Sequence, residues 1–317
     1  MSDYPPWAED LGHGVHAIDT GFHRARFDAA YLLVEGGRAA FIDSGPNAGL
    51  PRLLGLLDVL GLPRDAVDHV IPTHVHLDHA GGVGALMREL PAATLRVHPR
   101  GLRHLVDPSQ LYAGALAVYG QAEMDRSYGQ LVPVPAERVR ATEDGGSILL
   151  AGRTLQVAHT RGHARHHHCL WDERTRGWFS GDTFGMSYRE FDTAAGAWIL
   201  PTTTPVQFEP EHLKASVRRL LAADPACIYL THFGRITDVA RLGGHLLSLI
   251  DTMVDLARAA PAGETRLAAL QAALQTLYVD SLRAHGCTLG RDRILELIAL
   301  DIGLNAQGLA IWLDRDA

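Results

Sequence analysis

The chain has 317 residues, of which 47% are hydrophobic and 21% are charged, and its formal net charge is −7. This length exceeds one average domain and suits one large domain with an appendage. The acidic balance, with Lys214 as the single lysine, gives no general attraction to nucleic acid or to anionic membranes, so we expect neither as a partner.

Features that would direct the chain to a membrane or an oxidising compartment are not found in the sequence. No run of 18 apolar residues occurs, so we expect no membrane-spanning helix. The opening residues, Met-Ser-Asp-Tyr-Pro-Pro-Trp, lack the charged and apolar regions of a signal peptide. Cys169, Cys227 and Cys287 are too few and too scattered for a disulfide framework. We therefore expect a cytoplasmic protein.

Short apolar strands alternate with turns and helices through the first three quarters of the chain. The expected strands are residues 15–18, 30–34, 39–43, 94–98 and 227–231, with further strands within 138–172. The expected helices are residues 49–62, 82–90 and 210–223. This order predicts an α/β fold, an αβ/βα four-layer sandwich of two mixed β-sheets flanked by helices.

Two segments fall outside this pattern. Residues 101–131 look helical and carry aromatic side chains such as Tyr119, so they could wall a substrate pocket or form a satellite core. From residue 239 the chain is expected to be helical, over residues 239–260, 264–285 and 291–300. We therefore predict a catalytic domain over 1–238, with a helical insertion at about 101–131. The helical extension at 239–317 would serve as a cap or a dimerisation segment.

The densest group of metal-capable side chains lies in Thr-His-Val-His-Leu-Asp-His-Ala-Gly-Gly, residues 73–82. It places His74, His76, Asp78 and His79 within six residues, between the end of an expected strand and two glycines that open the next helix. Imidazole and carboxylate without thiolate suit zinc, manganese or iron. The alternative is a histidine-rich surface loop in a chain with 18 histidines, but such dense ligands in this setting favour a metal site.

This segment resembles the His-x-His-x-Asp-His signature of the metallo-β-lactamase superfamily, and the family's other motifs are present in order. They are Ile42-Asp43-Ser44-Gly45, Thr160-Arg161-Gly162-His163, Ser180-Gly181-Asp182-Thr183 and Leu230-Thr231-His232-Phe233-Gly234. The resemblance covers about residues 12–235. It implies that Asp43 braces the metal site from behind the ligands.

The resemblance implies a centre for two divalent ions, for which we expect zinc, with iron and manganese as alternatives. The residues implied for one ion are His74, His76 and His163, those for the other are Asp78, His79 and His232, and Asp182 bridges both. Two cations would lower the pKa of a bridging water to near neutrality and so supply a hydroxide. Asp78 is placed to orient this hydroxide or to carry a proton to the leaving group.

Departures from particular branches of the family narrow the expected reaction. Asp182 stands where true lactamases mostly carry cysteine or serine, which disfavours antibiotic hydrolysis. Residues 184–191 lack the Cys-Gly-Arg-Phe stretch of glyoxalase II, which puts a glutathione thioester in doubt. The motif spacing most resembles small-molecule acyl hydrolases of the glyoxalase II-like and quinolone-signal response thioesterase-like branch.

We therefore expect a dinuclear metal-dependent hydrolase of a small ester, thioester or lactone that uses a metal-bridging hydroxide. A phosphodiesterase and a regulatory or sensor protein that retains the metal site are the alternatives. The expected partner is a small-molecule substrate, and the sequence does not decide between a monomer and a homodimer.

Other residues near these motifs have less specific signals. His167 stands where many relatives have a second histidine after the ligand, so it could face the substrate or support the site. His166 and His168 are expected to be solvated or packed against the next strand. The segment Pro201-Thr202-Thr203-Thr204-Pro205 could line the pocket, although loop stiffening is the commoner reason for such composition.

Overall fold

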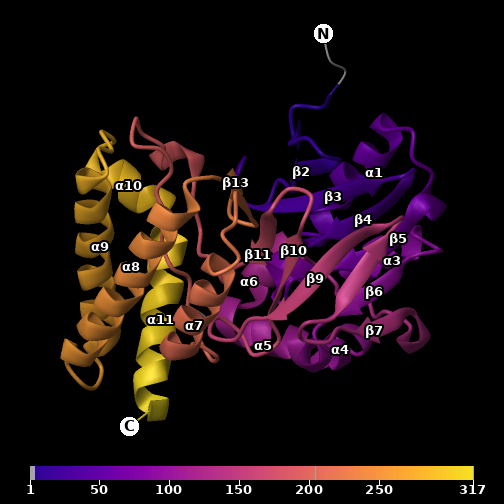
Figure 1. Cartoon of the computed structure of the whole chain (residues 1–317). Coiled ribbons are helices and arrows are strands. Elements are labelled where there is room, and N and C mark those ends of the chain that lie inside the picture. Colours follow the sequence, from indigo (N-terminus) through magenta and orange to yellow (C-terminus); the bar gives the residue numbers. More distant parts are fainter. Residues whose placement is uncertain (1–3, 204, 317) are drawn as a thin grey trace. The chain divides into compact units, whose positions relative to one another are not determined.

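A computed structural model of the chain describes residues 4–203 and 205–316 and contains two compact units (Figure 1). The first unit comprises the described residues of 1–159, 166–181 and 227–235. The second unit comprises those of 160–165, 182–226 and 236–317. The predicted domain boundary after residue 238 falls inside the second unit and stays a prediction. Thr204, in the predicted pocket-lining segment 201–205, lies outside the described residues.

A seven-stranded mixed sheet in the first unit follows the chain order. Its strands are β1 (Ala8–Asp10), β2 (Val15–Asp19), β3 (Ala29–Glu35), β4 (Arg38–Ile42), β5 (Val67–Ile71), β6 (Thr94–Val97) and β7 (Val139–Ala141). Strands β1 to β4 pair antiparallel and β4 to β7 pair parallel. Gly36 and Gly37 both have positive φ, which the tight hairpin between β3 and β4 requires, whereas the parallel pairs have long crossover connections.

A six-stranded mixed sheet has the order β13-β12-β11-β10-β9-β8. Its strands are β8 (Ser147–Leu150), β9 (Arg153–His159), β10 (His168–Asp172), β11 (Gly177–Gly181), β12 (Cys227–Leu230) and β13 (Gly234–Ile236). Tyr31 and Leu33 of β3 share one buried cluster with Leu170 of β10 and Phe179 of β11. The two sheets therefore pack face to face around an apolar core, and the expected α/β fold of two mixed sheets is confirmed.

The helices of the first unit are α1 (Leu50–Val59), α2 (Leu77–Ala80), α3 (Val83–Glu89), α4 (Pro99–Val106), α5 (Ser109–Tyr119) and α6 (Gln121–Glu123), followed by a π-helical turn at Met124–Tyr128. Helices α1 to α4 contribute buried side chains to the core on the other face of the seven-stranded sheet, whereas α5 and α6 have no buried residues. Leu53 and Leu56 of α1 pack with Phe41 and Val70 of the sheet. Short 3-10 helices lie at Asn47–Gly49, Arg64–Ala66, Ala136–Arg138 and, in the second unit, Arg189–Phe191.

The second unit is mainly helical. Its helices are α7 (Pro210–Leu221), α8 (Val239–Ala259), α9 (Arg266–Ala284), α10 (Arg291–Leu297) and α11 (Ala299–Asp316). Leu270, Leu274 and Tyr278 repeat at helical spacing on the buried face of α9, which lies alongside α8 and α11 (Figure 1).

The end of the helical extension differs from the expectation. A single helix was expected over 291–300, but the helix breaks at Ile298 and α11 continues to residue 316. Gly303, Asn305 and Gly308 have low helix propensity, so packing against α8 and α9 decides the outcome here. Among the described residues no single helix is long and apolar enough to cross a membrane, and α10 and α11 meet that test only as a pair bent by 65°.

Candidate metal centre

The seven predicted ligands are divided between the two compact units. The first unit holds His74, His76, Asp78, His79 and His232, and the second holds His163 and Asp182. The ligands of the first unit follow the carboxyl ends of β5 and β12, where side chains leave the ladder of a sheet and can converge.

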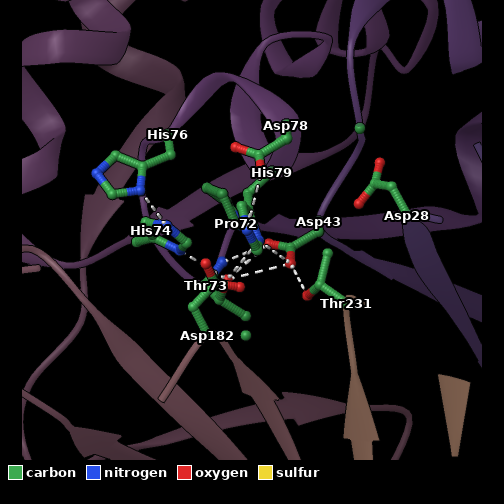
Figure 2. Close-up of polar contacts among 12 residues, drawn as sticks. Asp28, Asp43, Pro72, Thr73, His74, His76, Asp78, His79, Asp182 and Thr231 are labelled. Atoms are coloured by element: carbon green, nitrogen blue, oxygen red, sulfur yellow. Dashed lines mark hydrogen bonds and ion pairs between the residues drawn. The ribbon is translucent and has the colours of Figure 1, made fainter. Parts of the chain in front are cut away.

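The carboxylate of Asp43 organises the group in the first unit (Figure 2). Asp43 follows β4 directly, is 1% exposed and has a φ of 56°. Its Oδ1 accepts from the backbone N–H of Thr73 at 2.7 Å, and its Oδ2 accepts from the hydroxyl of Thr231 at 2.9 Å. The same Oδ2 lies 2.8 Å from Nδ1 of His79. Asp43 thus ties the loop after β5 to the end of β12 and orients the imidazole of His79.

Asp78, His79 and His232 each offer one ligand atom, and these atoms lie within 4.8 Å of one another. Nε2 of His232 lies 3.4 Å from Oδ2 of Asp78, and Nε2 of His79 lies 3.7 Å from the same oxygen. Nδ1 of His232 lies 3.0 Å from the carbonyl oxygen of Phe27. Both histidines therefore engage a protein acceptor through Nδ1 and direct Nε2 to a carboxylate, as metal-binding imidazoles do.

His74 and His76 form a close pair beside this group. Nε2 of His74 lies 2.7 Å from Nδ1 of His76, so two imidazole nitrogens converge on one region. The ring of His167 stacks on His74 at 4.7 Å between centroids, and both rings are buried. His167 therefore supports a predicted ligand by packing. Tyr119 lies on α5 and packs its ring 5.7 Å from that of Tyr128.

His163 and Asp182 form a matching pair in the second unit. Nε2 of His163 lies 3.3 Å from Oδ2 of Asp182, and both side chains are buried. Nδ1 of His163 faces the carbonyl oxygen of Thr202 at 3.5 Å. The preceding Gly162 has a φ of 127°, and a Cβ there would lie 2.2 Å from the backbone of Leu213 in α7. Only glycine lets this loop approach α7 so closely.

The donor chemistry of both groups suits divalent metal ions. The candidate donors are imidazole nitrogens and carboxylate oxygens, a set that zinc, manganese and iron accept. His79, His232 and His163 all have Nδ1 at a protein acceptor, which leaves the Nε2 lone pair for an ion. The described residues thus contain a histidine and aspartate cluster that can hold metal.

Asp28 is a buried acid that the sequence analysis did not identify (Figure 2). It precedes β3, and its Oδ2 accepts from the hydroxyl of Thr20 at 2.7 Å, while its Oδ1 has no hydrogen-bond partner among the described residues. Burial raises the pKa of Asp28 to about 7, and the nearby His232 and His79 oppose this rise. The feature of the sequence that could have identified Asp28 is its position directly before the apolar strand Ala29–Glu35.

His166 and His168 are both packed, one of the two environments expected for them. Nε2 of His168 lies 3.0 Å from the carbonyl oxygen of Pro72, and its Nδ1 lies 2.9 Å from the hydroxyl of Thr142. Burial lowers the pKa of His168 to about 3, so its imidazole is neutral at physiological pH. This histidine holds the residue just before the metal-binding loop.

Comparison with known proteins identifies a family and several relatives. The model of the metallo-β-lactamase superfamily matches residues 24–232. The metallo-β-lactamase fold-containing protein ST1585 of Sulfurisphaera tokodaii is 26% identical over 235 residues, which are 71% of this chain and 80% of that protein. A hydroxyacylglutathione hydrolase of Aeromonas hydrophila is 27% identical over 203 residues, which are 64% of this chain and 59% of that protein.

A further relative, the acyl-coenzyme A thioesterase MBLAC2 of Gallus gallus, is 29% identical over 188 residues, which are 54% of this chain and 63% of that protein. The chain thus spans less than two thirds of the length of the Aeromonas hydrolase and of the Gallus thioesterase.

A similar fold occurs among solved structures. The metallo-β-lactamase family protein TTHA1429 of Thermus thermophilus has a TM-score of 0.67 and 18% identity. This match covers 97% of this chain and 95% of that one, so the likeness of fold includes the helical extension.

Proposed function

Because the chain belongs to the metallo-β-lactamase superfamily and is a metal-dependent hydrolase, we propose that it hydrolyses a small acyl compound, with a thioester as the first choice. The names of two relatives, a hydroxyacylglutathione hydrolase and an acyl-coenzyme A thioesterase, support this class of substrate. The missing Cys-Gly-Arg-Phe stretch after Thr183 favours a thiol carrier other than glutathione. Esters and lactones are the next members of the class to test.

We propose that the chain uses two divalent ions, zinc by preference and iron or manganese otherwise. The residues that would hold them are His74, His76 and His163 for one ion, Asp78, His79 and His232 for the other, and Asp182 for both. The observation that carries this proposal is the shared orientation of His79, His232 and His163, each with Nδ1 at a protein acceptor. When bound, such ions supply Lewis acidity and lower the pKa of water towards neutrality.

Asp78 is the residue that we propose to move a proton. Its side chain is 21% exposed, whereas those of His79 and His232 are almost completely buried. Its Oδ2 lies 3.4 Å from Nε2 of His232 and 3.7 Å from Nε2 of His79, where one ion could bind all three atoms, and its exposure leaves the carboxylate accessible to a substrate. A carboxylate in this setting can orient a nucleophile or deliver a proton to a leaving group.

The direct test is an assay of protein reconstituted separately with zinc, iron and manganese. The substrates would be an acyl-coenzyme A, a hydroxyacylglutathione, p-nitrophenyl acetate, a lactone and bis-p-nitrophenyl phosphate. We expect metal-dependent thioester hydrolysis and about two ions per chain by elemental analysis. Phosphodiester turnover without any acyl turnover would contradict the proposal. Normal cellular activity of a metal-free variant would favour the sensor alternative.

We propose a small-molecule substrate, a cytoplasmic location and neither nucleic acid nor membrane as a partner. The helical extension at 239–317 would govern substrate access, with a homodimer as the alternative. Leu309 and Trp312 are buried within the second unit, whereas Ile311 is 37% exposed. The substitution Ile311→Ser therefore changes the surface of the helical extension and leaves the core of the extension intact. A changed KM at constant metal content would support the access role. A changed sedimentation coefficient with unchanged kinetics would support the dimer.

A further inference from the structure

The segment that carries Thr202 is held by one side chain of the C-terminal helix. Asn305 of α11 is 1% exposed, and its Oδ1 accepts from the backbone N–H of Thr203 at 2.7 Å. Its Nδ2 donates to the carbonyl oxygen of Pro201 at 3.0 Å. The hydroxyl of Thr203 donates in return to the backbone carbonyl of Asn305 at 3.2 Å. One amide therefore anchors the backbone on both sides of Thr202.

Other buried contacts keep Asn305 in place. Its Nδ2 also donates to the hydroxyl oxygen of Tyr278 on α9 at 2.9 Å. One turn earlier on α11, Asp301 accepts from the hydroxyl of Tyr188 at 3.2 Å. Asp301 and Asn305 are four residues apart and share a helix face, so this face of α11 holds two points of the chain between Asp182 and α7. Such satisfied buried networks are rigid and specify one arrangement.

The carbonyl group between the two anchored positions is the one that faces His163. The carbonyl oxygen of Thr202 lies 3.5 Å from Nδ1 of His163, while Nε2 of that ring lies 3.3 Å from Oδ2 of Asp182. An acceptor at Nδ1 selects the tautomer that carries its proton there and leaves the Nε2 lone pair for an ion. Thr202 belongs to no helix or strand, so its position depends on the contacts of its neighbours, which are those of Pro201 and Thr203 with Asn305 and the backbone pairing of Leu200 with Met186.

We infer that Asn305 is a positioning residue for the metal centre: it holds Pro201 and Thr203 so that the Thr202 carbonyl orients His163 towards Asp182. This inference rests on the proposed function, in which His163 and Asp182 are ligands. The C-terminal helix thereby contributes to metal affinity without supplying a ligand of its own.

The test compares Asn305→Leu with Tyr278→Phe in the full-length protein. Leucine fills a similar volume but removes both side-chain contacts to the 201–203 segment. Phenylalanine removes the hydroxyl at the other end of the same network and leaves those contacts in place. Affinity for Co²⁺ would be measured by competition with a chromogenic chelator, together with the absorption spectrum of the Co²⁺ protein and its thermal melting.

We expect Asn305→Leu to bind one of two Co²⁺ ions about 10- to 100-fold more weakly and to change the Co²⁺ spectrum, as loss of an outer hydrogen-bond partner does at metal sites. Tyr278→Phe should lower the melting temperature and keep both the affinity and the spectrum of the wild type. Wild-type affinity in Asn305→Leu would overturn the inference. Equal losses in both variants would overturn it too, because they would indicate general destabilisation.

Two further outcomes separate this inference from the proposed function. Wild-type protein that binds no Co²⁺ would contradict the proposed metal centre itself. If circular dichroism shows that Asn305→Leu is unfolded, Asn305→Asp takes its place, because aspartate keeps the acceptor for the Thr203 N–H and loses the donor to Pro201. We expect a smaller loss of Co²⁺ affinity in this variant, and a folded Asn305→Asp protein with wild-type affinity would overturn the inference.

Discussion

The imidazoles of the two compact units are oriented by the same chemistry but by different parts of the fold. In the first unit, His79 is oriented by Asp43 at the end of β4, and His232 by the carbonyl of Phe27 just before β3. In the second unit, His163 is oriented by Thr202, whose irregular segment is held by Asn305 of α11.

The acceptors that orient the imidazoles are held in place by different numbers of backbone contacts in the two units. The positions of Asp43 and Phe27 follow from strands that are paired in a sheet by many backbone hydrogen bonds. The position of Thr202 follows from a few contacts of its neighbours, chiefly with the buried amide of Asn305, about a hundred residues further along the chain, and from the pairing of Leu200 with Met186. We therefore expect the second-unit ligands to respond to distant changes more readily than the first-unit ligands.

Asp182→Ala should have the largest effect on the second-unit pair. The resemblance makes Asp182 the residue that bridges both ions, so its loss should remove at least one ion per chain and abolish activity. Elemental analysis and the substrate panel provide the measurement. Asp280→Ala, which removes an exposed acid of α9 in the same unit, is the control and should keep both ions. A variant at Asp182 that retains two ions would contradict the bridging role.

Asp78→Asn should have the next largest effect, this time in the first unit. Asparagine keeps the size and one oxygen donor but cannot carry the proton, so turnover should fall at least about a hundredfold. Metal content should stay at that of the wild type, which separates chemistry from binding. Turnover within a few-fold of wild type at full metal content would rule out the proton-carrying role.

Asp43→Asn sharpens the comparison between the two units. The amide would put an N–H donor into a site where Asp43 accepts from Thr73 and Thr231 and faces Nδ1 of His79. We expect one ion to bind about 10- to 100-fold more weakly, in parallel with the effect of Asn305→Leu. Asp68→Asn, at a partly exposed acid of β5 that pairs with Arg38, is the control. Equal affinity of Asp43→Asn and Asp68→Asn would show that strand pairing alone orients His79.

The smallest expected effect is a pH dependence of stability in the first unit. Burial lowers the pKa of His168 from 6.5 to about 3, so below pH 6.5 the unfolded state takes up a proton that the folded state does not. The contribution of His168 to the free energy of unfolding is thus fully present above pH 6.5. As the pH falls towards 3, this contribution decreases by up to about 1.4 kcal/mol per pH unit.

The control for this effect is His168→Asn, which cannot titrate. Its free energy of unfolding, measured by denaturant titration between about pH 6.5 and 4, should fall with pH less steeply than that of the wild type. Identical slopes in the two proteins would contradict the assignment of the low pKa to His168.

Four of the five first-unit ligands could be predicted from the sequence because their donors are close together and their setting is local. His74, His76, Asp78 and His79 lie within six residues after an apolar strand, so the strand alone brings them to one place. His163, Asp182 and His232 carry no such local signal and were found through family motifs in chain order. Asp28 was missed because a single acid before a strand does not reveal whether it is buried.

The sequence by itself determined the α/β fold, the family and the chemical nature of the donors, because strand periodicity, turn residues and ligand types are local properties of the chain. Only the tertiary structure decided which acceptor orients each imidazole. Thr202 is 39 residues from His163, and Asn305 is 102 residues from Thr203, so neither contact follows from spacing. The continuation of α11 to residue 316 has the same origin, since packing against α8 and α9 outweighs the low helix propensity of its glycines.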